Sequence, residues 1–162
     1  MQDLLPIAAR IGVLLKARGE TVAVSESAAG GLVAASLLAL PGASAYFRGG
    51  AVVYTAQARG GLLGITHDDM RGMRSASEPY AALCAATIRR KLDADWGVAE
   101  TGAAGPSGNR YGDAAGHACL AVAGAMTRVT TLETGSADRA DNMRRFAAAA
   151  LILLEQAITE AP

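Results

Sequence analysis

The sequence has few aromatic residues and no net charge, and each of these features excludes a class of protein. Aromatic residues make up 4% of the chain although 51% of its residues are hydrophobic, so its core must be built from small, closely packed aliphatic side chains. Fifteen basic residues balance fifteen acidic ones, and no long basic run is present. The charge pattern of a nucleic-acid-binding protein is therefore missing, and we expect no nucleic-acid partner.

Cysteines and long apolar runs are also scarce. Cys84 and Cys119 lie in apolar stretches without a C-x-x-C partner, which predicts buried free thiols in a reducing compartment. The longest apolar run, 146–154, is shorter than the roughly 20 residues that cross a bilayer. Asp3 and Pro6 interrupt the pattern that a signal peptide would need. We therefore expect a cytoplasmic protein with no membrane partner.

The order of hydrophobic patterns predicts one α/β domain that covers residues 1–162. Helical patterns alternate with short aliphatic runs before a closing hairpin and helix. This order predicts a three-layer α/β/α sandwich with a mixed sheet and an antiparallel edge. One helix begins with a pattern typical of a capping box, Ser75-x-x-Glu78. Helices are expected at 4–18, 32–40, 75–92 and 138–158, with a further short helix that ends at residue 63. Strands are expected at 21–25, 49–55, 95–101, 117–124 and 127–135.

The most informative stretch, 25–31, follows a predicted strand and enters a helix. Gly30 and Gly31 would let a ligand approach unpaired backbone N–H groups, as phosphate does at the N-terminus of a helix. The alternative is that Ser27 caps the helix and the glycines form the turn. The stretch matches neither a Walker loop nor a dinucleotide-binding fingerprint.

Two further strand exits carry residues suited to binding. Gly102 to Asn109 is rich in glycine, and Tyr54 to Arg59 places a phenol and a cation one turn apart. Because ligands of open α/β sheets bind beyond the carboxyl ends of the strands, these exits and that of Ser27 are expected to surround one cleft. The alternative for the second exit is a surface helix with an exposed arginine.

The histidines and the start of the last helix carry weaker signals. His67 and His117 lack the spacing of a metal site, and we expect a structural or solvated role for each. Without a well-placed histidine, a Ser-His-Asp hydrolase is not favoured. Near the last helix, Asp138, Arg139, Arg144 and Arg145 either pair with a substrate phosphate or form a solvated, charged first turn.

The strings at the strand exits resemble a known family. SESAAGG, GGAVVYTAQARGGLLGI, SASEPYA, TGAAGPSGN and DRADNMRR are similar in order and spacing to the C-terminal domain of the CinA competence/damage-inducible family, the nicotinamide-nucleotide amidohydrolases. The resemblance covers nearly the whole chain. It implies a homodimer or larger homo-oligomer that hydrolyses nicotinamide mononucleotide to nicotinic acid mononucleotide and ammonia, without a metal or other cofactor.

The resemblance also implies roles for individual residues. It places the nucleophile at Ser27 and further catalytic residues at Tyr54 and Arg59. At the position of Arg59 the family has a lysine. The family's Cys-Thr pair is replaced by Ala28 and Ala29. Arginine cannot serve as a base in place of lysine, because its guanidinium stays protonated. The implied substrate-binding residues are Gly30, Gly31, Ser77, Gly102, Gly105, Pro106, Arg139 and Arg144.

These departures leave three hypotheses for the function. In the first, Ser27 attacks a carboxamide, Tyr54 transfers or orients a proton, and Arg59 holds charge. In the second, the chain is a nucleotide-binding or regulatory module that turns over slowly or not at all. In the third, it is a different hydrolase acting on another phosphorylated small molecule, because a fold does not fix the substrate. If the three strand exits form one cleft, we expect Ser27, Tyr54, Arg59 and Gly105 to lie around one pocket.

Overall fold

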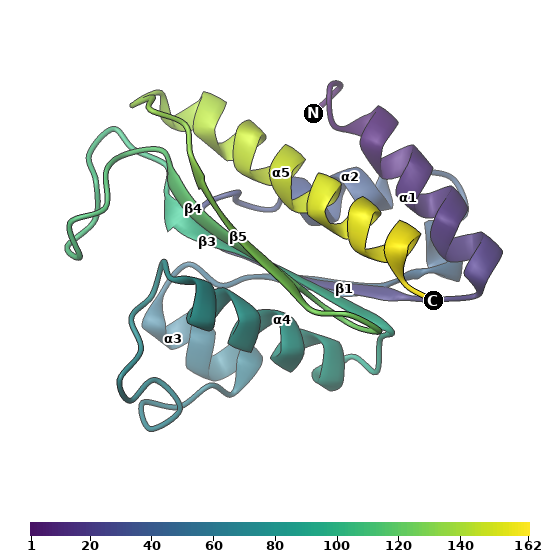
Figure 1. Cartoon of the computed structure of the whole chain (residues 1–162), viewed down its shortest axis with the longest axis horizontal. Helices are drawn as coiled ribbons and strands as arrows, with labels where there is room; N and C mark the ends of the chain where they lie inside the picture. The colour runs from purple at the N-terminus through teal and green to yellow at the C-terminus, as the bar shows by residue number, and fades with distance from the viewer.

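A mixed sheet runs through the middle of the computed structural model, which describes residues 1–162 (Figure 1). Its strands are β1 (Val22–Glu26), β2 (Phe47–Val52), β3 (Trp96–Ala103), β4 (His117–Ala123) and β5 (Arg128–Glu133). They lie in the order β2-β1-β3-β4-β5. The pairs that β1 makes with β2 and β3 are parallel, whereas the pairs β3–β4 and β4–β5 are antiparallel.

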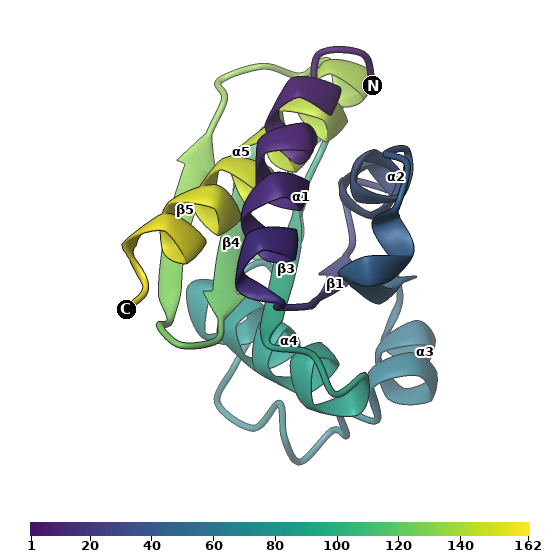
Figure 2. The same ribbon diagram turned by 90° about the vertical axis from the view of Figure 1, so that its right-hand side faces the viewer.

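Helices cover both faces of this sheet (Figure 2). One layer contains α1 (Leu5–Arg18), α2 (Leu32–Leu38) and α5 (Arg139–Glu160), and the other contains α4 (Glu78–Lys91) and α3 (Ala56–Ala58), which continues into a π-helical turn at Arg59–Leu63. The expected three-layer sandwich with a mixed sheet is confirmed. None of these helices combines the length and the apolar character that crossing a bilayer requires.

Alternation along the strands creates two cores, one on each face of the sheet. Val22, Val24 and Val98 belong to the larger core, shared with α1, α2 and α5, whereas Ala23 and Ala99 belong to the smaller core under α4. Because side chains alternate across a strand, neighbouring residues serve different layers. The buried, unpaired thiols Cys84 and Cys119 lie in the smaller core, as expected.

The start of α4 differs from the expected capping pattern. Ser77, not Ser75, has the extended backbone of a cap, and its hydroxyl accepts a hydrogen bond from the N–H of Tyr80 (3.4 Å). Ser77 also donates to the carbonyl of Arg74 (2.7 Å). The prediction of a capping box at Ser75 is therefore wrong, because the helix begins two residues later than that pattern requires.

The close contact between α4 and β3 yields a first prediction. A Cβ on Gly97 would lie 2.1 Å from the carbonyl oxygen of Ala85, so Gly97→Ala must push α4 away from the sheet. We expect a loss of about 1–3 kcal/mol in the free energy of unfolding, measured by urea denaturation. Gly60→Ala is the matched control, because its Cβ would meet nothing within 4 Å. Equal stability of the two variants would contradict the contact.

Candidate functional site

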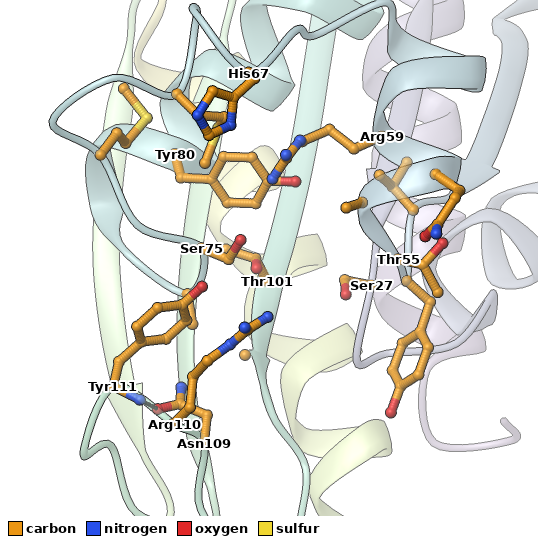
Figure 3. Close-up of a pocket in the computed structure, with 18 residues that line it drawn as sticks. Ser27, Thr55, Arg59, His67, Ser75, Tyr80, Thr101, Asn109, Arg110 and Tyr111 are labelled. Atoms are coloured by element: carbon orange, nitrogen blue, oxygen red, sulfur yellow. Dashed lines mark hydrogen bonds between the residues drawn. The ribbon is translucent and has the colours of Figure 1, made fainter.

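A cleft of about 840 Å³ opens where β1, β2 and β3 end, on the side of the sheet that α4 covers. Ser27 follows β1, Tyr54 follows β2, and Thr101 and Gly102 lie at the end of β3. Figure 3 shows Arg59, Tyr80 and His67 at one end of the cleft, Asn109, Arg110 and Tyr111 at the other, and Ser27, Ser75 and Thr101 between them. Three segments that are distant in the sequence therefore meet at one site.

The charged side chains that line this cleft are basic. No aspartate, glutamate or lysine lines it, and neither Arg59 nor Arg110 takes part in an ion pair. The Nε atom of Arg59 is buried without a hydrogen-bond partner, and its guanidinium points towards the phenol of Tyr80. Burial raises the pKa of that phenol, which therefore stays protonated. Because guanidinium groups without ion-pair partners bind anions well, the cleft is suited to an anionic ligand.

The backbone N–H groups at the start of α2 are already bonded within the protein. Those of Val33 and Ala34 donate to the carboxylate of Glu26 at 3.1 and 3.0 Å. The N–H of Gly30 donates to the carbonyl of Ser27 (3.1 Å). The expectation that these groups are free to bind a phosphate is therefore wrong, because the last residue of β1 occupies the position of the anion.

The glycines before α2 form a turn. Gly30 and Gly31 have φ angles of +69° and +100°, which residues with a Cβ adopt rarely. A Cβ on Gly30 would lie 2.6 Å from Cε of Met143. Neither glycine lines the cleft, and Gly31 rather than Ser27 occupies the N-cap position of α2. The turn-forming alternative is therefore correct for the glycines, whereas the capping role of Ser27 is wrong.

A buried carboxyl that the sequence reasoning missed lies behind Ser27. Oε2 of Glu100 accepts hydrogen bonds from the backbone N–H groups of Ser27 (2.9 Å) and Ala29 (2.8 Å). Its Oε1 is buried without any partner, and burial raises the pKa of Glu100 to about 7. The available signal was an acidic residue inside an otherwise uncharged strand, β3.

Arg139 joins two strand exits at the rim of the site. Its Nη2 donates to the hydroxyl of Tyr54 (3.1 Å), and its Nη1 donates to the carbonyl of Gly105 (2.7 Å). Arg144 instead pairs with Asp141 (2.9 Å) on the exposed surface. The two arginines thus do not act on a common point, and Gly105, Pro106, Ser77, Arg139 and Arg144 do not line the cleft.

The wall formed by Asn109 and its neighbours is fixed by a charged network. Asp113 accepts hydrogen bonds from the side chains of Arg74 and Asn109. Beside it, the ring nitrogens of His117 lie 2.5 Å from Oε1 of Glu133 and 3.0 Å from the carbonyl of Ala76. Burial opposes protonation of His117, but these acceptors outweigh it and raise its pKa. His117 therefore has the structural role expected for it.

His67 occupies a different position from the one expected. It is exposed and forms no ion pair, as predicted for a solvated side chain, but it also lines the cleft. In Figure 3 it lies at the same end as Arg59. It thus adds an imidazole to the lining of the cleft, and its sequence context did not predict that position.

Comparison with known proteins gives one consistent result. The model of the CinA C-terminal domain family matches residues 4–158. A CinA-like protein from Gloeobacter violaceus is 38% identical over 154 residues, an alignment that covers 94% of this chain and 36% of that protein. The chain thus spans about a third of the length of such curated relatives.

Solved structures agree with this result. The competence/damage-inducible protein CihA from Agrobacterium tumefaciens superposes with a TM-score of 0.89 at 28% identity, covering 98% of this chain and 96% of that one. The competence damage-inducible protein A from Klebsiella pneumoniae superposes with a TM-score of 0.91 at 24% identity, covering 98% and 99%. The second likeness concerns the fold alone.

Proposed function

Because the chain belongs to the CinA C-terminal domain family, we propose that it hydrolyses the carboxamide of nicotinamide mononucleotide, giving nicotinic acid mononucleotide and ammonia, with Ser27 as the nucleophile. The observation that carries this proposal is the position of Ser27 between Arg59 and Arg110, which line the two ends of the cleft without ion-pair partners. A guanidinium of this kind is a good partner for a phosphate or a developing oxyanion.

The reaction assigns a definite task to each group. The hydroxyl oxygen of Ser27 bonds to the carboxamide carbon, the C–N bond breaks, and the hydroxyl proton leaves with the nitrogen as ammonia. Water then attacks the resulting ester, which releases the carboxylic acid and restores the serine hydroxyl. The guanidinium of Arg59 binds the negative charge of the substrate. Tyr54, bound to Arg139 at the rim, orients the substrate.

A second candidate function is a nucleotide-binding module with little or no turnover. It is favoured by the lining of the cleft, which contains no lysine, aspartate or glutamate and whose one imidazole, His67, lies at the Arg59 end rather than beside Ser27. A serine needs a neighbouring base to become a strong nucleophile. Both candidates use the same basic cleft and the same class of ligand. They differ in whether ammonia is released.

One experiment separates the two candidates. Purified protein is incubated with nicotinamide mononucleotide, ammonia is measured, and the melting temperature is recorded with and without the nucleotide. A ligand that binds only the folded state raises that temperature. Ammonia from the wild type but not from Ser27→Ala is the result expected for the amidohydrolase. A thermal shift without ammonia identifies the binding module, and neither effect would overturn both.

Ser27→Ala is a clean control in this experiment. The hydroxyl of Ser27 makes no hydrogen bond in the structure. Its backbone N–H donates to Glu100, and its carbonyl accepts from the N–H of Gly30. Removing that hydroxyl therefore leaves the contacts with Glu100 intact. We expect the variant to keep the thermal shift caused by the nucleotide while ammonia release disappears, and loss of both would point to a misfolded site.

A further inference from the structure

The buried carboxyl of Glu100 holds the backbone that carries the candidate nucleophile. One of its oxygens binds two N–H groups of the same short turn, those of Ser27 and Ala29. Glu100 itself is 3% exposed. Its side chain extends from the face of β3 opposite Thr101, since successive side chains point to opposite faces of a strand, and Thr101 lines the cleft. Glu100 therefore supports the turn from behind.

The other oxygen of Glu100 is unusual for a folded protein. Oε1 is buried and accepts no hydrogen bond, although an ionised carboxylate can accept about four. A buried charged oxygen without a hydrogen-bond partner costs free energy, so burial favours the neutral, protonated form of the Glu100 carboxyl. The carboxyl thus has two accessible states, which differ in how strongly Oε2 holds the turn.

The surroundings of Glu100 contain no compensating positive charge. Burial is the main cause of the raised pKa of Glu100. A second buried carboxyl, that of Glu26 on the neighbouring strand β1, raises this pKa further. Neither carboxyl takes part in an ion pair. The paired residue on β4 is Leu120, and the buried residues of α2 and α5 are all uncharged. His117, the other buried charged residue, is engaged with Glu133 and Ala76.

We propose that Glu100 is a positioning residue whose ionised carboxylate fixes the turn of Ser27 and Ala29 and whose protonation loosens that turn, so that the site is better ordered when Glu100 is ionised. The charged form makes the stronger bonds, because hydrogen bonds to an ionised acceptor are about twice as strong as neutral ones. The consequence for catalysis rests on the proposed function. The effect of Glu100 ionisation on the turn does not depend on that function.

Nuclear magnetic resonance of the unliganded, ¹⁵N-labelled protein tests the titration directly. We expect the amide protons of Ser27 and Ala29 to move together with one apparent pKa near 7 as the pH is raised from about 5 to about 9, and Glu100→Gln to remove that movement. The amide of Thr66 is the internal control. It donates to Asp69 (2.7 Å), whose pKa is lowered chiefly by that bond, so it stays constant over this range.

The outcomes of this experiment are distinct. Amides of Ser27 and Ala29 that do not titrate, or that titrate unchanged in Glu100→Gln, overturn the proposal. Glu100→Gln preserves an oxygen acceptor of the same size, so folding is retained, and the unchanged titration of His117 in both proteins serves as a check on the comparison.

Kinetics then separate the positioning role from a structural one. In the wild type, kcat/KM for ammonia release is expected to rise with the same apparent pKa, and in Glu100→Gln it is expected to fall at least tenfold above neutrality and to lose that inflection. An unchanged pH profile in the variant would contradict the positioning role. If the amides titrate but the wild type releases no ammonia at any pH, the proposed amidohydrolase fails while the hold of Glu100 on the turn stands.

Discussion

Glu100→Gln is expected to raise the free energy of unfolding by about 3 kcal/mol at about pH 8 and to change it little at about pH 4. In the folded protein burial raises the pKa of Glu100 to about 7, from an ordinary value of 4.5. Above that range the wild type must keep a buried charge with one unpartnered oxygen. The glutamine keeps the acceptor for Ser27 and Ala29 without the charge.

The direction of this effect follows from the proton balance. Between the unfolded and folded pKa values the folded state binds one proton more than the unfolded state, so stability falls as the pH rises through this window. The contribution of Glu100 to the free energy of unfolding is therefore fully present below the ordinary pKa of a glutamate, and it is lost as the pH rises through about 7. Urea denaturation of the wild type and Glu100→Gln across this pH range measures the difference in their free energy of unfolding. The contributions of the other carboxyls are the same in both proteins and cancel.

A carboxyl of opposite behaviour provides the control. Glu155 bonds to Arg10, which lowers its pKa, so Glu155→Gln should lose a little stability above neutrality and none in acid. A Glu100→Gln protein that is less stable than the wild type at about pH 8 would show that the carboxylate stabilises the fold. The predicted combination, a more stable protein with a weaker site, is the pattern of a residue retained for function at a cost in stability.

The fold was predictable because it depends on local patterns. The spacing of apolar residues in 4–18 places α1, and Gly19 ends it with a φ of +65° as a helix-terminating glycine should. Strands β1 and β4 are buried along their whole length, and the sequence indicates this through the short apolar runs 22–24 and 118–123. These signals survive because burial on both faces of a sheet leaves little freedom in residue type.

The site was only partly predictable, since its contacts are long-range. The strand exits of Ser27, Tyr54 and Thr101 could be placed together from topology alone. The partner of the Ser27 turn is 73 residues away on β3, however, and no local pattern indicates that a carboxylate satisfies these N–H groups. For the same reason the glycines suggested an open phosphate site. Arg110 and Tyr111 reach the cleft from a loop whose path depends on Asp113 and its partners.

Arg59→Lys is expected to increase the rate of ammonia release from nicotinamide mononucleotide by tenfold or more. A positioned general base typically contributes ~10²–10⁴-fold to a rate. The lining of the cleft contains no lysine or carboxylate, and its one histidine, His67, lies at one end of the cleft rather than beside Ser27. A lysine at this position places its Cε where the buried Nε of Arg59 lacks a partner. Its amine would be desolvated there, which lowers the pKa of an amine and favours the neutral, basic form.

The single substitution is a better test than one that also restores the threonine of the family at position 29. Ala29 is 0% exposed and belongs to the larger core, so Ala29→Thr would force two additional heavy atoms into a packed region. Arg59→Gln is the matched control for Arg59→Lys, because it removes the positive charge without providing a base. Both variants are compared with the wild type for ammonia release and for the thermal shift with the nucleotide.

The three proteins separate the role of charge from that of proton transfer. If Arg59 only holds the anionic ligand, Arg59→Lys retains the thermal shift, Arg59→Gln weakens it, and neither exceeds the wild-type rate. If the missing base limits turnover, only Arg59→Lys releases ammonia faster. A wild type that already turns over at an ordinary enzymatic rate of about 10 s⁻¹, and that loses this rate in Arg59→Lys, would show that the guanidinium itself supports the activation of Ser27.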